Sequence, residues 1–318
     1  MSRETAVAQP GIKQESYLKR LGKDLKKNSL LYLLILPGLV YYIIFKYVPM
    51  YGVLLAFKRY KAKLGILGSP GVGFDNFERF FSSYNCGLLI KNTIEISLYS
   101  LLVGFPIAII FALMLNYVRS KRLKKTVQMV SYAPHFISTV VICGMLKIFM
   151  NVDSGIFNQI LGHMGIESID FLSKPGMFKS IYVWSSIWQQ TGWSAIIYIS
   201  ALSSVDYEMH EAAIVDGATK LQRIIHIDLP SIKSTIIMKL ILEMGSIMSV
   251  GFEKVYLLQN DLNMSSASVI STYVYEMGLI NHDYGFSTAV GLFNSLINMA
   301  LLLAANKVCK KVADESLF

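Results

Sequence analysis

Aromatic, amide and carboxylate side chains interrupt two long apolar stretches of this sequence, and they are the residues best suited to hold a ligand. Aromatic faces pack against the apolar surfaces of a ligand, while amides and carboxylates hydrogen-bond its polar groups, usually in a concave site with a few convergent polar groups. An ionisable group inside an apolar stretch is also a functional-site hypothesis by default. The candidates are Trp188, Gln189, Gln190, Trp193, Glu243, Glu253 and Tyr256.

Each of these candidates also has a structural interpretation. Trp and Tyr are enriched at membrane interfaces, and Gln, Asn or Ser side chains often bond one helix to another, so structure is favoured over ligand contact at any single position. Asn294 and Asn298, one helical turn apart, suit helix–helix hydrogen bonding. His135 follows Pro134, and a polar side chain at a kink is an ordinary helix feature, so we assign it no proton-relay role.

Motifs of catalytic, metal and nucleotide sites are missing from the sequence. No HExxH or GxSxG occurs, and no His, Cys and carboxylate cluster has ligand spacing. Cys86, Cys143 and Cys309 lie far apart, which argues against a disulfide framework or a metal site. The glycine-rich segment 65–74 lacks the Lys-Ser/Thr of a phosphate-binding loop, and a turn before a short helix over 75–81 is the better interpretation. We predict no catalytic residue, metal ligand or bound cofactor in this chain.

The composition requires a hydrophobic solvent. Of the 318 residues, 53% are hydrophobic and 16% are charged, whereas about a quarter of the residues in an ordinary globular domain are charged. Charged residues still interrupt the fifth of six apolar stretches, so that stretch is expected to face protein or a water-filled cavity. The six stretches, each long enough to cross about 30 Å of hydrocarbon, are 29–48, 93–117, 127–150, 181–205, 235–258 and 286–305.

These stretches predict an all-α integral membrane protein with six transmembrane helices over 29–306, between a basic segment 1–28 and a tail 307–318. If the N-terminus is cytoplasmic, eighteen Lys and Arg residues fall on that side of the membrane and eight on the other. The positive-inside bias therefore predicts that both termini are cytoplasmic. The net charge of +9 is explained by these short clusters, which do not form the basic stripe of a nucleic-acid-binding protein.

The loop 206–230, on the predicted cytoplasmic side, has the capping and turn residues of a helix-turn-helix. Asp206 suits the N-cap of a helix over 207–215, and Gly217 accepts a positive φ in a turn. A second helical stretch over 218–227 can then leave at a new angle, with Pro230 ending it near the first turn of the next span. Alanines at the elbow would let another protein approach the backbone closely.

The residues of this loop match a known motif. Glu211-Ala212-Ala213, Gly217, Ile227, Leu229 and Pro230 fit every position of the frame EAA-x3-G-x9-I-x-LP, which resembles the EAA loop of permease subunits of binding-protein-dependent ABC importers. In that family the loop is the coupling helix that seats in a groove of the ATPase. The resemblance implies that Glu211 contacts the ATPase and that Gly217 is the elbow. The coupling residues so implied are Glu211, Ala212, Ala213, Asp216, Gly217, Ile227, Leu229 and Pro230.

The resemblance extends over most of the chain. The stretches 92–116, 132–138, 188–202 and 271–279 look like the carbohydrate-uptake branch, and within it like permeases for oligosaccharides, including plant-polysaccharide fragments. It implies a type I importer permease fold in the bacterial plasma membrane and an oligosaccharide substrate. The implied partners are a second homologous permease in a heterodimer, two ATPase subunits that bind ATP and Mg²⁺, and an extracellular solute-binding protein. Another solute class, an ion-coupled carrier and an intramembrane enzyme remain alternatives.

Overall fold

The computed structural model describes residues 23, 24 and 26–313, and almost all of this part of the chain is helical. Most of the predicted segment 1–28 and residues 314–318 of the predicted tail lie outside it. The chain divides into two compact units, Met1–Val53 and Leu54–Phe318. No strand occurs among the described residues, where an isolated bridge joins Lys58 to Gly71.

The first unit contains helices that are apolar on every face. They are α2 (Ser29–Tyr42) and α3 (Val48–Met50), joined by a π-helical turn over Ile43–Tyr47. None of the residues in α2 is buried. A helix that is hydrophobic all round needs lipid or protein around it, so α2 has the surface of a membrane helix.

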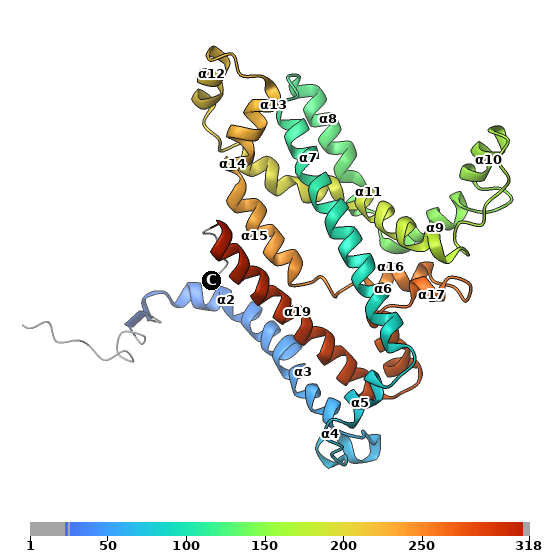
Figure 1. Cartoon of the computed structure of the whole chain (residues 1–318). Coiled ribbons are helices and arrows are strands. Elements are labelled where there is room, and N and C mark those ends of the chain that lie inside the picture. The colour runs from blue at the N-terminus through green and yellow to red at the C-terminus, as the bar shows by residue number, and fades with distance from the viewer. Residues whose placement is uncertain (1–22, 25, 314–318) are drawn as a thin grey trace, which may run out of the picture. The chain divides into compact units, whose positions relative to one another are not determined.

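The second unit is built from helices of very different lengths (Figure 1). They are α4 (Gly65–Gly68), α5 (Asp75–Phe81), α6 (Cys86–Tyr99), α7 (Phe105–Asn116), α8 (Lys121–Tyr132), α9 (Thr139–Phe149), α10 (Ile156–His163), α11 (Pro175–Leu202), α12 (Tyr207–Val215), α13 (Lys220–Arg223), α14 (Leu229–Ser231), α15 (Lys233–Met244), α16 (Phe252–Leu258), α17 (Met264–Ala267), α18 (Ile270–Tyr275) and α19 (Tyr284–Ala313). The helix expected over 75–81 is confirmed as α5. Helix α19 continues beyond the predicted sixth span, so 307–313 extend that helix.

Three helices in the described part of the chain are long and apolar enough to cross a membrane: Ser29–Phe57, Cys86–Asn116 and Tyr284–Lys311. They contain nearly all of the first, second and sixth predicted spans. The pair Lys121–Phe136 and Thr139–Phe149 would count as a fourth span if it were taken as one bent helix. Length and composition alone therefore do not reproduce the predicted count of six.

The third predicted span, 127–150, is not one straight helix. Its two halves meet at an angle of 97°. Pro134 lies in a 3-10 turn at the end of α8, and the Ser138 hydroxyl accepts a hydrogen bond from the Val141 N–H and so begins α9 as a new helix. The kink expected beside Pro134 is thus a sharp bend, because these local signals end one helix and begin another.

The fifth predicted span, 235–258, is also interrupted. Helix α15 ends at Met244 and α16 begins at Phe252, with an unwound segment between Gly245 and Gly251. The Asn298 side chain accepts a hydrogen bond from the Met248 N–H at 2.8 Å and donates one to the Ser249 hydroxyl at 3.0 Å. Asn298 of α19 therefore bonds the unwound segment rather than a second helix, and it satisfies backbone that the break has freed.

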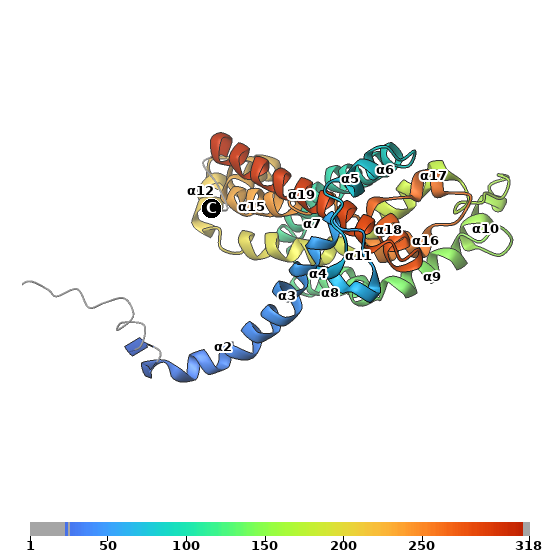
Figure 2. The same ribbon diagram turned by 90° about the horizontal axis from the view of Figure 1, so that it is seen from below.

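Two ends of the second unit can be told apart (Figures 1 and 2). Helices α12 and α13 lie near the C-terminal end of α7 at one end, and α10 lies at the other, near α9 and α17. Helix α11 runs between them and packs along α7 through small and aromatic side chains that include Ala108, Ala112, Ala195 and Tyr198. The loop 206–230 is therefore separated from the opposite loops by the length of the helices.

Close packing of α11 against α8 depends on Gly192. A Cβ added there would lie 2.2 Å from the carbonyl oxygen of Ser131. We expect Gly192→Ala to lower the free energy of unfolding by about 1–3 kcal/mol, because the two helices must separate. Thermal unfolding of the detergent-solubilised chain measures the change.

The matched control for this prediction is Gly144→Ala in α9. No atom lies within 4 Å of a Cβ added at Gly144, and alanine is the better helix former by roughly 0.5–1 kcal/mol. The control should unfold at the native temperature or slightly above it. Equal unfolding temperatures for Gly192→Ala and the native chain would show that the helices do not approach as described.

Candidate functional site

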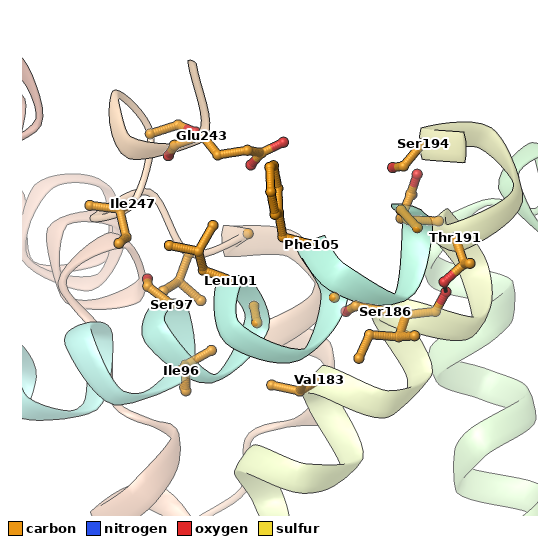
Figure 3. Close-up of a pocket in the computed structure, with 18 of the residues that line it drawn as sticks. Ile96, Ser97, Leu101, Phe105, Val183, Ser186, Thr191, Ser194, Glu243 and Ile247 are labelled. Carbon is orange, nitrogen blue, oxygen red and sulfur yellow. Dashed lines mark hydrogen bonds between the residues drawn. The ribbon is translucent and has the colours of Figure 1, made fainter. Parts of the chain in front are cut away.

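A cavity of about 520 Å³ lies among α6, α7, α11 and α15 (Figure 3). Its volume falls within the range of ordinary ligand pockets. Hydroxyl groups dominate the polar part of its wall, and a carboxylate, an ammonium group, an amide and an imidazole join them. The polar lining side chains are those of Ser97, Ser100, His135, Tyr182, Ser186, Gln190, Thr191, Ser194, Tyr198, Lys239, Glu243, Ser246 and Ser249.

The structure brings three of the predicted ligand residues, Gln190, Trp193 and Glu243, to this cavity. The Trp193 ring stacks on the His135 ring, with centroids 4.2 Å apart and planes at 4°. The His135 Nδ1 lies 2.9 Å from the Gln190 Oε1, and because an amide oxygen only accepts, Nδ1–H is the donor. The result is a flat aromatic surface beside an oriented amide.

Glu243 enters the cavity as half of an ion pair. The Lys239 Nζ lies 2.6 Å from the Glu243 Oε1, one helical turn away along α15. Both side chains are part-exposed, so the pair keeps access to the cavity while its charges compensate each other. The wall therefore offers both a cation and an anion to hydroxyl or carboxylate groups of a ligand.

The other four predicted ligand residues do not line the cavity. Gln189 is buried and its Nε2 donates to the Ile137 carbonyl at 3.1 Å, which satisfies backbone at the break between α8 and α9. Tyr256 stacks on Phe252. Trp188 is exposed elsewhere on α11, and Glu253 lies in the first turn of α16, where a carboxylate favours the helix dipole.

Helical periodicity separates the lining residues of α11 from the others. The residues that face the cavity recur at i, i+3 or i+4, and i+7 or i+8, which is one face of a helix. This stripe of hydroxyls, an amide and aromatics is visible in the sequence. It could have identified the cavity-lining residues of α11 that we did not predict as ligand residues. The stripe consists of Tyr182, Ser186, Gln190, Thr191, Trp193, Ser194 and Tyr198, and the apolar Val183 and Ile187 lie among them. His135, interpreted from the sequence as an ordinary kink residue, lines the cavity because α8 ends beside this face.

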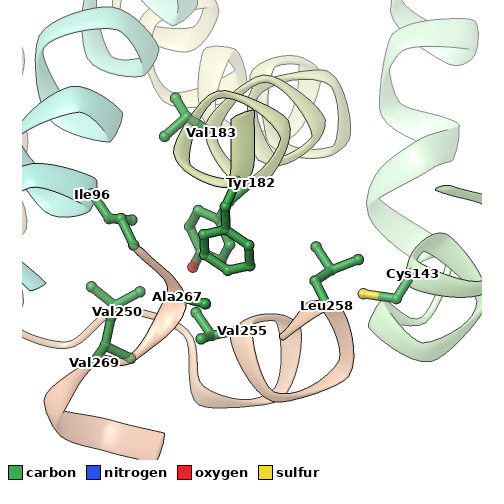
Figure 4. Close-up of a cluster of buried hydrophobic side chains, with 10 residues drawn as sticks. Ile96, Cys143, Tyr182, Val183, Val250, Val255, Leu258, Ala267 and Val269 are labelled. Atoms are coloured by element: carbon green, nitrogen blue, oxygen red, sulfur yellow. The ribbon is translucent and has the colours of Figure 1, made fainter. Parts of the chain in front are cut away.

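One part of the cavity wall belongs to a buried hydrophobic cluster (Figure 4). Ile96, Tyr182, Val183 and Val250 both line the cavity and belong to this cluster, which continues into α9 and α16. Behind the wall, the buried Lys254 Nζ donates to the Ser186 hydroxyl at 2.8 Å. Close-packed interiors resist deformation, so the part of the wall formed by this cluster is expected to be rigid.

The loop 206–230 folds largely as its sequence indicates. Helix α12 spans Tyr207–Val215, as predicted, and the Asp206 side chain accepts from the Glu208 N–H at 3.0 Å. Gly217 has a φ of +79°, and the Ala218 N–H donates to the Ala213 carbonyl at 2.8 Å. These bonds close the end of α12 and turn the chain.

The second half of the loop differs from its prediction at Pro230. Helix α13 is short, and a π-helical turn over Ile224–Asp228 connects it to α14, so the helical path continues to Ser231. The Leu229 N–H bonds to the Ile224 carbonyl across this turn. Pro230 then falls in the first turn of α14, where its missing N–H costs little, and so it does not end the stretch.

The surface of the loop suits contact with another protein. A groove of about 260 Å³ lies at the elbow and is lined by Ala213, Ala218, Gln222, Arg223, His226 and Ile227. Of the residues implied by the motif, Glu211, Ala212, Asp216, Gly217 and Pro230 are exposed, Ala213 and Leu229 are half-buried, and Ile227 is buried. The Ile227 side chain is therefore buried within the second unit, while the exposed residues remain available to a partner.

The family match and the similar proteins agree with each other. Residues 104–313 match the family described as binding-protein-dependent transport system inner membrane component. The chain is 46% identical to protein LplB of Bacillus subtilis over 92% of each chain. It is 42% identical to the polygalacturonan/rhamnogalacturonan transport system permease protein YteP of the same species over 94% of each.

Solved structures give the same result. One chain of a bacterial ABC transporter involved in the import of the acidic polysaccharide alginate is 40% identical and superimposes with a TM-score of 0.86, covering 92% of this chain and 99% of that chain. A second structure shows the bacterial alginate transporter in complex with a periplasmic protein that binds an alginate pentasaccharide, also with a TM-score of 0.86.

Proposed function

Because the chain belongs to the family of binding-protein-dependent transport system inner membrane components, we propose that it carries an oligosaccharide across the membrane through the cavity beside α11. It is a permease subunit of an ABC importer, and the permeases of this family are not catalytic. The observation that carries the proposal is the Trp193–His135 stack beside Gln190 in a hydroxyl-rich cavity. Such a surface suits the C–H face and the hydroxyls of a sugar ring.

The substrate that we propose is a fragment of a polysaccharide. YteP is named for polygalacturonan and rhamnogalacturonan, and the solved transporter imports the acidic polysaccharide alginate. The cavity supports an acidic fragment as well as a neutral one, since Lys239 reaches its wall and Lys254 lies behind Ser186. Competition between acidic and neutral oligosaccharides distinguishes the two.

The proposed partners follow from the two surfaces. A second homologous permease would pair with this chain to enclose the path, and an extracellular binding protein would deliver the substrate. Two ATPase subunits, which bind ATP and Mg²⁺, would dock on the loop 206–230 through the coupling residues around Glu211 and Gly217. This requires the loop and both termini to be cytoplasmic, as the distribution of Lys and Arg predicts.

Reconstitution tests the proposal. The chain is assembled with its partner permease, ATPase and binding protein in proteoliposomes, and uptake of labelled oligosaccharides is measured with and without ATP. We expect uptake that needs both ATP and the binding protein. Uptake that follows an ion gradient without ATP would instead support an ion-coupled carrier. Failure of the chain to bind any ATPase would contradict the proposal.

A further inference from the structure

Asp228 is a fully buried carboxylate, 0% exposed, at the end of the π-helical turn in the loop 206–230. Its Oδ2 accepts a hydrogen bond from the Tyr117 hydroxyl at 2.7 Å. Tyr117 directly follows α7, and 111 positions separate the two residues in sequence. A residue of the loop is thus bonded to the end of a membrane helix.

Helix α12 reaches the same carboxylate from the other side. The Nε2 of His210, a side chain 12% exposed, lies 3.3 Å from the Asp228 Oδ1. His210 immediately precedes Glu211, and its ring meets the edge of the Tyr117 ring at 6.4 Å. The Arg223 guanidinium of α13 lies 5.6 Å from the Tyr117 ring. Groups from α7, α12 and α13 therefore converge around Asp228.

The contact with His210 is incomplete. The separation is that of an ion pair, but hydrogen-bond geometry is not met, and Asp228 Oδ1 has no hydrogen bond within the described part of the chain. A buried acceptor without a hydrogen bond is unfavourable, so an orientation of α12 that aligned His210 with Oδ1 would be favoured. The energy of the cluster hence depends on the orientation of α12 relative to α7.

Packing does not explain a carboxylate at this position. The frame EAA-x3-G-x9-I-x-LP leaves residue 228 unspecified, and an apolar side chain of similar size often stabilises a buried site at least as well as a charged one. Helix α7, in turn, presents Phe105 and Ala108 to the cavity at its far end. The hydrogen bond at Asp228 therefore lies on a continuous path from α12 through Tyr117 and α7 to the cavity wall.

We propose that Asp228 is a positioning residue that connects the loop 206–230 to α7, so that movement of α12 by an ATPase reaches the cavity wall. The inference rests on the proposed function. Coupling of this kind needs a physical link between two sites, and here the link is the Tyr117–Asp228–His210 cluster. Asp228 lines neither the cavity beside α11 nor the groove at the elbow of the loop.

The test uses the assembled transporter with Asp228→Asn, Tyr117→Phe and the two combined. Each single change removes the charge or the donor of one hydrogen bond while keeping the shape of the side chain. We expect assembly and basal ATP hydrolysis to stay native, while stimulation of hydrolysis by the substrate-loaded binding protein and uptake per ATP fall about tenfold, the usual scale for a hydrogen bond to a charged group. The double variant should be no worse than Tyr117→Phe, since that change alone removes the bond, whereas Asp228→Asn removes the charge and keeps an oxygen that can accept it.

Tyr84→Phe is the matched control, because Tyr84 is 98% exposed and lies far along the chain from the loop. It should leave stimulation unchanged. Native stimulation in both single variants, or additive losses in the double variant, would overturn the proposal. Loss of assembly in both single variants would also overturn it, because Asp228 would then serve docking rather than transmission. Failure of the native chain to assemble or transport would instead contradict the proposed function.

Discussion

Replacing Gly217 with proline is expected to abolish retention of the ATPase by this chain. Proline fixes φ near −65°, whereas Gly217 has a φ of +79° and its N–H donates to the Ile214 carbonyl at 3.0 Å. The elbow between α12 and α13 cannot keep its direction with proline. We expect ATPase binding to weaken by at least about 100-fold, since a misplaced proline costs about 3 kcal/mol. Co-purification of detergent-solubilised complexes measures it.

Gly217→Asn is the matched control for this prediction. Asparagine tolerates a positive φ better than other residues with a side chain, so this variant should keep most of the ATPase. Gly217→Ala should fall between the two. Membrane insertion and monodispersity are followed in all variants, because the spans should be untouched. If Gly217→Pro retains the ATPase as well as the native chain does, the loop is not the docking element.

Replacing Trp193 with alanine is expected to raise the oligosaccharide concentration needed for half-maximal uptake by about 10- to 100-fold. The change removes the flat surface that stacks on His135 and leaves the hydrogen bond between His135 and Gln190 in an enlarged cavity. Truncation of a central aromatic anchor commonly costs about 2 kcal/mol or more of binding free energy. Uptake into proteoliposomes, measured as a function of the concentration of loaded binding protein and of substrate, gives this value.

Trp188→Ala provides the comparison on the same helix. Trp188 is 53% exposed and lies outside the cavity, so its loss should change uptake by less than about twofold, within the range usual for surface substitutions. ATPase retention should be native in both variants, which separates substrate binding from assembly. Equal losses for the two tryptophans would show that uptake does not depend on the face of α11 that lines the cavity.

Features that depend on neighbours in the chain could be predicted from the sequence. The bounds of α12 follow from Asp206 as an N-cap, and the turn after it follows from Gly217. Both are decided by hydrogen bonds and backbone angles within a few residues, so the local residue types are sufficient. The apolar character of the first, second and sixth spans is likewise a sum over consecutive residues.

Only the tertiary structure decided which residues share a site. A hydropathy window averages along the chain, so it did not reveal the unwound segment that Asn298 holds within 235–258. The face of α11 that meets the cavity depends on where α7, α8 and α15 pack, which is why Gln190 and Trp193 line it and Gln189 and Trp188 do not.

Asp228 shows most directly what could not be predicted from the sequence. The sequence places it as an unspecified residue between Ile227 and Leu229, whereas folding brings it to the hydroxyl of Tyr117, 111 positions away. Local chemistry determined the helices, the turn and the loop motif of this chain. The pairing of distant polar groups was decided by burial, because a polar group removed from water takes the partner that the packed helices bring to it.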